Sequence, residues 1–208
     1  MHFFRVTLLS FVLLASAAAP AQDMFPQPPE LQPDVDFWIA VFTDYSTDEG
    51  VLHDNRNLDI VYDRVAMPAE LSRRERQRRV AARRKQLQAV LRTLASGKRD
   101  ELTAEEARVL SLWPDGVSNE TLAAAVKRIR YQQGLRERFR EGLQRSGRWR
   151  DYINAQFTAL GVPTEIAALP HVESSYDPAA RSHVGASGIW QFTRSTGRRF
   201  MRVDHVID

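Results

Sequence analysis

Residues 161–200 read GVPTEIAALPHVESSYDPAARSHVGASGIWQFTRSTGRRF, and this stretch decides how the C-terminal part of the chain folds. Ile166, Leu169 and Glu173 follow helical spacing, so the carboxylate of Glu173 shares a face with two aliphatic side chains. Pro170 predicts that this helix bends or ends soon after Glu173. An acid on an apolar face loses hydration, which predicts a raised pKa for Glu173 and a role as a general acid.

A loop of small residues is expected after Glu173. Asp177 lies before a proline, so it is predicted to cap a turn rather than to serve as a second catalytic acid. Trp190 and Gln191 bring a flat apolar ring and an amide to one place, a pair suited to a sugar ring and its hydroxyls. Residues 189–192 are expected to open a helix that stops at Gly197. Small residues that let backbone approach a ligand lie between the turn and this helix: Ser182, Gly185, Ser187 and Gly188.

These residues carry a family resemblance. Glu173-Ser174, Ser182 and the Gly188-Ile189-Trp190-Gln191 segment resemble the opening half of the lytic transglycosylase (SLT) domain, which is related to goose-type lysozyme. The string ALPHVESSYDP…SHVGASGIWQF is most similar to the membrane-bound lytic transglycosylase D branch, and the likeness covers roughly residues 152–200. The resemblance implies that Glu173 is the single catalytic acid and base. It also implies that substrate is bound by Ser174, Ser182, Gly188, Trp190 and Gln191.

The same resemblance implies a reaction. Glu173 would protonate the oxygen of the β-1,4 bond between N-acetylmuramic acid (MurNAc) and N-acetylglucosamine (GlcNAc), and would then take the proton of the muramyl C6 hydroxyl, which closes a 1,6-anhydro-MurNAc ring. Neither a metal nor a cofactor is expected. Glycosidases generally need two carboxylates, and this stretch offers one good candidate. Two alternatives remain open: a hydrolytic muramidase that uses a carboxylate beyond Asp208, and a non-catalytic peptidoglycan-binding protein.

Each candidate residue also has a purely structural interpretation. Glu173 could be a buried acid held by Arg181, and Ser182 could satisfy the backbone of its own loop. Trp190 could belong to the core, Gln191 could brace the loop, and Gly188 could serve the backbone alone. The two nearby histidines show no metal-ligand spacing, so both are expected to be structural or exposed: His171 and His183.

The N-terminus predicts export. Residues 1–21 have a basic start, a short apolar run and a small-residue cleavage site, as in a secretory signal peptide, and residues 22–33 form a Pro-rich linker. The chain has no cysteine, which excludes a lipoprotein, a disulfide and thiol chemistry. We therefore expect a periplasmic protein associated with the cell wall. At the other end, the family's downstream Ala-Tyr-Asn segment lies beyond Asp208, so the sequence is expected to be truncated within the domain.

Residues 34–147 are expected to form a basic helical region. A helix is predicted from Leu71 to Leu94, a capping box from Thr103 to Glu106, and one long helix after Ser118 whose buried side continues to Leu143. Residues 45–57 are predicted to be a loop in which His53 and Asp54 form a turn rather than a metal or catalytic pair.

Charge is distributed unevenly along the chain. Residues 72–150 carry 21 Lys and Arg against 9 Asp and Glu, whereas the whole protein has a formal net charge of only +3. This basic segment could contact an anionic wall or membrane surface in addition to peptidoglycan strands, although a solvated helix surface is the interpretation favoured over a specific binding site. Nucleic acid binding is not expected, because the chain shows an export signal and no recognition motif.

The predicted architecture is mainly α. An N-terminal helical region leads to residues 148–208, the first part of a lysozyme-like transglycosylase domain. A helix with Trp149, Ile153, Phe157 and Leu160 on one face, terminated by Gly161, begins this part.

Overall fold

The computed structural model describes residues 25–200, so the predicted signal peptide (1–21) lies outside the described part. The elements of the first half are 3-10 helix η1 (Pro29–Leu31), α1 (Gln32–Thr43), β1 (Glu49–Asp54), β2 (Val61–Ala66), α2 (Arg73–Ala95), α3 (Ala104–Leu110) and α4 (Asn119–Ala125). Those of the second half are β3 (Ile129–Gln133), α5 (Arg136–Ser146), α6 (Arg150–Leu160), 3-10 helix η2 (Thr164–Ala168), α7 (Leu169–Glu173) and α8 (Arg194–Phe200). The mainly α prediction is confirmed. None of the helices between residues 25 and 200 is both long and apolar enough to cross a membrane.

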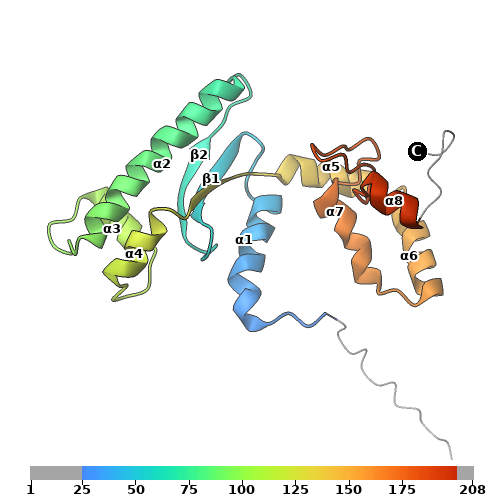
Figure 1. The fold of residues 1–208 in the computed structure, drawn as a ribbon, viewed down its shortest axis with the longest axis horizontal. Helices are drawn as coiled ribbons and strands as arrows, with labels where there is room; N and C mark the ends of the chain where they lie inside the picture. Colours follow the sequence, from blue (N-terminus) through green and yellow to red (C-terminus); the bar gives the residue numbers. More distant parts are fainter. Residues whose placement is uncertain (1–24, 201–208) are drawn as a thin grey trace, which may run out of the picture.

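The elements form two groups that meet where α1 packs against α5 (Figure 1). In the N-terminal group, a three-stranded antiparallel sheet has the order β2-β1-β3. The long helix α2 packs with α3 and α4, and its apolar face joins the core that Leu52 and Tyr62 form beside it. Phe37 and Val41 of α1 pack against Val51 of the central strand in a second cluster. Strand β1 is therefore enclosed from two sides.

Helix α2 follows the sequence prediction closely. Ser72 accepts the Glu75 amide and the Glu75 carboxylate accepts the Ser72 amide, a capping box that satisfies donors at the helix start. The helix ends before Gly97, whose φ of +96° favours glycine. The predicted capping box between Thr103 and Glu106 is also present, at the start of α3.

The single long helix predicted after Ser118 is wrong. The chain instead forms α4, strand β3 and α5. Gly134 explains the interruption after β3, because a Cβ there would collide with the backbone of Tyr45. The next amide, of Leu135, donates to the Val41 oxygen of α1 at 2.8 Å. A tertiary contact thus overrides the helical spacing of the apolar residues.

The loop predicted for residues 45–57 is also wrong, because it contains strand β1. His53 and Asp54 lie buried in this strand rather than in an exposed turn. Asp54 is fully buried, and its Oδ2 accepts from Arg128 Nε at 2.8 Å. The basic region 34–147 therefore contains a sheet as well as helices. The Pro-rich linker is also shorter than predicted, because α1 already begins at Gln32.

The C-terminal group is built from α6, η2, α7 and the loop before α8 (Figure 1). Its core consists of Ile153, Ala167 and Tyr176, with Trp149, Phe157, Ile189 and Trp190 packed around it. The predicted helix after Trp149 is confirmed as α6, and Gly161 ends it with a φ of +67°. Phe139 of α5 contacts both groups, since its ring lies 5.3 Å from Phe42 and 5.5 Å from His171.

The last helix differs from its prediction. It begins at Arg194 rather than near Ile189, and Gly197 is buried inside it instead of ending it. Gln191 has a φ of +48°, which is incompatible with helix at that position. The Thr193 hydroxyl accepts the amide of Thr196 at 3.3 Å and so caps the helix that follows.

Candidate active site

Glu173 is the last residue of α7. The amides of Ser174 and Tyr176 both donate to the Pro170 oxygen at 3.1 Å, which ends the helix as predicted. The burial predicted for Glu173 is wrong: its side chain is exposed and, within residues 25–200, makes no hydrogen bond or ion pair. Arg181 therefore does not hold it.

The change of helix type explains this outcome. Residues 164–168 form a 3-10 helix and only residues 169–173 are α-helical, so a constant spacing of 3.6 residues does not hold across the segment. Ala167 and Pro170 face the core, whereas Leu169 is 50% exposed and shares the outer side with Glu173.

The backbone after Glu173 is strained. Ser175 and Tyr176 have φ values of +52° and +55°, in the left-handed region that non-glycine residues seldom adopt. Tyr176 is nevertheless buried and donates its hydroxyl to the Ala167 oxygen. Gln191 also has a positive φ. Within residues 25–200, four residues other than glycine have a positive φ, and three of them lie around Glu173 and the 188–192 segment. Each such residue costs about 1–3 kcal/mol, and strain of this kind clusters at functional sites.

A hydrogen bond connects Ser174, the residue after Glu173, to the small-residue loop. The hydroxyl of Ser174 donates to the Ile189 oxygen at 2.9 Å and so joins the end of α7 to the Gly188–Gln191 segment. The side-chain amide of Gln191 donates to the Gly188 oxygen at 2.8 Å. The Ser182 hydroxyl accepts a hydrogen bond from the backbone amide of Ala186 at 3.0 Å. These side chains brace the loop, and their contact with substrate remains a prediction.

A surface hollow of about 380 Å³ lies beside this loop. Gly188 and Trp190 line it, whereas Ser174, Ser182 and Gln191 do not line it and hydrogen-bond to the backbone of the loop. Its lining consists of Arg181, Gly185, Ser187, Gly188, Ile189, Trp190, Phe192, Thr193, Arg194 and Gly197. Trp190 also packs against Phe157 at a ring distance of 5.9 Å, so the indole belongs to both the core and the hollow. Aromatic, hydroxyl and guanidinium groups around a concave surface suit a polar, ring-shaped ligand.

Asp177 and two histidines are further polar residues near the site. Asp177 Oδ1 accepts the Ala179 amide at 2.9 Å, which is the turn cap predicted for it. His171 is half-buried against Tyr176, and burial lowers its pKa. His183 is exposed. No group of three or more His, Cys, Asp or Glu side chains within the described residues is arranged to hold a metal ion.

Sequence reasoning missed the support that α5 gives to the strained turn. Arg145 Nε donates to the Ser175 oxygen at 2.9 Å, and a Cβ on Gly142 would lie 3.1 Å from Ser175. Both contacts join residues about thirty positions apart, and no local spacing signals them.

Comparison with known proteins finds similarity in the segment that contains these residues. The model of the transglycosylase SLT domain family matches residues 152–206. Membrane-bound lytic murein transglycosylase D of Escherichia coli strain K12 is 45% identical over 49 residues, which is 24% of this chain and 11% of that protein. The protein of the same name from E. coli O6:H1 strain CFT073 has the same identity and coverage. The resemblance of this segment to lytic transglycosylases is confirmed, and the matched part spans about a ninth of those relatives. No solved structure matches the chain.

Proposed function

Starting from the transglycosylase SLT domain match at residues 152–206, we propose that this chain is a lytic transglycosylase that cleaves peptidoglycan. The observation that most supports the proposal is the bond from Ser174 to the Ile189 oxygen. It brings the end of the helix that carries Glu173 together with the Gly188–Gln191 segment, and both lie inside the matched range.

The proposed reaction uses one carboxyl group twice. Protonated Glu173 donates to the oxygen between MurNAc and GlcNAc, and the bond from muramyl C1 to that oxygen breaks. The C6 hydroxyl oxygen of the same MurNAc then bonds to C1, and its proton returns to the Glu173 carboxylate. The products are 1,6-anhydro-MurNAc and a free GlcNAc hydroxyl, so the enzyme is regenerated without water.

Because Glu173 is exposed in the free protein, bound substrate would change the surroundings of its carboxyl group. An acid that is open to solvent is stabilised in its charged form by water. A glycan strand lying over α7 and the neighbouring hollow would displace that water from around the carboxyl group. Catalytic hydrogen bonds are often absent from a free enzyme and form only with substrate.

Product analysis tests the proposal. Purified sacculi incubated with the chain in water enriched in heavy oxygen should yield muropeptides with anhydro ends that carry no label. Labelled reducing ends would instead identify a hydrolytic muramidase. Sedimentation of the chain with sacculi without release of any fragment would favour a non-catalytic binding protein.

We also propose that the protein is exported and that α2 lies against an anionic phospholipid surface. Arg74, Arg78, Lys85 and Arg92 are exposed on its outer side, at intervals of four, seven and seven residues. None of them forms an ion pair with another described residue. The helix has 23 residues and is therefore about 34 Å long, so a row of four cations along one face matches a planar anionic surface.

Vesicle sedimentation tests this contact. The variant Lys85→Gln/Arg92→Gln should bind vesicles containing phosphatidylglycerol more weakly than the wild type, and added salt should reduce the difference. The control Arg138→Gln/Arg140→Gln removes the same charge from exposed positions on α5. Equal loss in both variants would show that net charge, not the face of α2, determines binding.

A further inference from the structure

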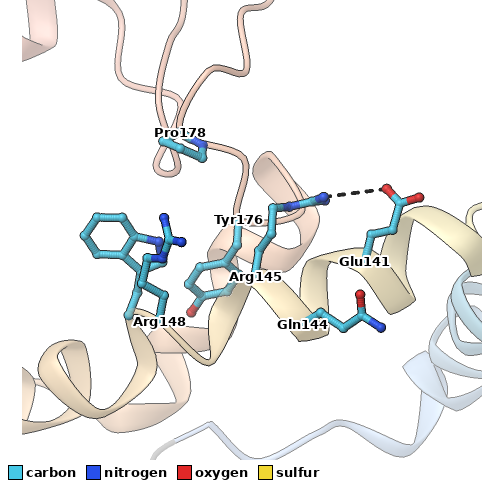
Figure 2. A pocket seen from close by; sticks show the side chains of 7 residues that line it. Glu141, Gln144, Arg145, Arg148, Tyr176 and Pro178 are labelled. Carbon is cyan, nitrogen blue, oxygen red and sulfur yellow. Dashed lines mark ion pairs between the residues drawn. The ribbon is translucent and has the colours of Figure 1, made fainter.

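A second cavity lies on another side of the strained turn, where α5 meets α6. It has a volume of about 330 Å³ and shares no lining residue with the hollow beside Trp190. Its lining consists of Glu141, Gln144, Arg145, Arg148, Trp149, Tyr176 and Pro178. Figure 2 shows α5 on one side of the opening and Pro178, from the turn after Tyr176, on the other.

The charged groups of this cavity are only partly neutralised. Arg145 is fixed by its Nε bond to Ser175, and its Nη1 lies 3.5 Å from the Glu141 carboxylate, a long contact. In Figure 2 its guanidinium is directed toward Glu141. The Arg148 side chain is exposed and has no ion pair or hydrogen bond with any other residue of the described part. The lining therefore holds two guanidinium groups and one carboxylate, and the cavity is positive.

The walls add an apolar component. Trp149, Tyr176 and Pro178 surround the guanidinium groups, so a ligand would present an anionic group beside short aliphatic parts. A neutral sugar ring would leave Arg148 unpaired. Glu141 would repel a doubly charged phosphate but would tolerate a single carboxylate, and could receive an ammonium group.

From this geometry we propose that the Arg145–Arg148 cavity binds a carboxylate of the peptide stem of peptidoglycan. The proposal rests on the proposed function, since it names a second part of the same substrate. Peptide stems carry free carboxylates, aliphatic side chains and amino groups, which are the chemical groups that the cavity matches. Arginine recognises such carboxylates through paired N–H groups.

The cavity is connected to the site of cleavage through Arg145. The guanidinium that would bind the carboxylate also holds the Ser175 oxygen, two residues after Glu173. Gly142, one turn earlier on α5, packs against the same residue. A bound stem would therefore steady the turn that positions Glu173, and strands that carry peptides should be cleaved faster than bare strands.

Calorimetric titration of the full chain with a synthetic stem tripeptide tests the proposal directly. Arg148→Gln should weaken binding roughly tenfold, because one charge-assisted hydrogen bond is lost. The control Arg150→Gln should bind like the wild type, since Arg150 is exposed, does not line the cavity and has only a 3.4 Å contact with Asp151. Amidation of the tripeptide carboxylates should weaken binding to the wild type by a larger factor than binding to Arg148→Gln, which retains only Arg145 as a partner for the carboxylate.

Three results would overturn the proposal: no binding of the tripeptide by the wild type, equal binding by Arg148→Gln, or no effect of amidation. A second test measures the cleavage of peptide-free glycan strands, which carry free lactyl carboxylates. If Arg148→Gln slows cleavage of these strands as much as that of intact sacculi, the cavity does not recognise the peptide. Failure of the proposed function gives a different pattern, in which the tripeptide binds but no anhydro product forms from any substrate.

Discussion

Replacement of Asp54 by asparagine should destabilise the N-terminal group strongly. Asp54 is fully buried, and its Oδ1 accepts the amides of Arg56 and Asn57 at 2.9 and 3.0 Å. Its Oδ2 accepts from Arg128 Nε at 2.8 Å and from the Tyr62 hydroxyl at 3.4 Å. An asparagine that keeps the two backbone bonds must turn its NH₂ group toward the N–H of Arg128, so one attraction becomes a clash of donors.

The magnitude follows from burial. Arg128 has a side-chain exposure of only 18%, and its Nη2 already lacks a partner within the described residues. Breaking a buried ion pair by removal of one charge costs about 3–5 kcal/mol, and the partial exposure of Arg128 favours the lower end. For a chain of this length, a loss of about 3 kcal/mol corresponds to a decrease in Tm of about 6–12 °C.

Urea denaturation and thermal melting of Asp54→Asn measure this loss. The control Asp59→Asn changes an exposed carboxylate that makes no side-chain hydrogen bond within residues 25–200, and should shift stability by less than about 0.5 kcal/mol. If Asp54→Asn lost no more stability than the control, Asp54 and Arg128 would not form the buried pair described above.

Two further predictions concern α5 and the surface ion pairs. Gly142→Ala should lower the free energy of unfolding by about 1–3 kcal/mol, because its Cβ would press on Ser175. It should also lower the rate of muropeptide release. Gly147→Ala, with only an ordinary 3.5 Å contact, should be tolerated. Equal melting temperatures and rates for the two variants would contradict the support assigned to α5. Hydrogen bonds from Arg108 and Arg83 lower the pKa of Glu105 to about 2 from 4.5, so its stabilising effect is present above pH 4.5 and is lost as pH falls toward 2. Denaturation midpoints of Glu105→Gln should therefore depend less on pH in that range than those of the wild type, and parallel curves would contradict the assignment.

The features that the sequence predicted best are those that depend on residues close together in the chain. The capping box of Thr103 and the glycine stop at Gly161 were both predicted, because each satisfies backbone groups within a few positions. The sheet was missed because β1 pairs with β3, about eighty residues away, and such pairing leaves little local pattern.

The candidate site was predicted in part for the same reason. The motif that contains Glu173 and Trp190 was evident in the sequence, but the exposure of Glu173 depends on the change from 3-10 to α-helix at Leu169. The contact of Arg145 with Ser175 spans thirty residues and follows from the packing of α5 on the turn.

The most direct test of the account compares Glu173→Gln with Glu165→Gln, an equal change at an exposed acid of η2. The measurement is the initial rate at which each variant releases anhydro-muropeptides from sacculi. Loss of a general acid should slow Glu173→Gln by about 10²–10⁴-fold and leave Glu165→Gln close to the wild type. Release of anhydro-muropeptides by Glu173→Gln at the wild-type rate would contradict the central claim that this carboxyl group carries the reaction.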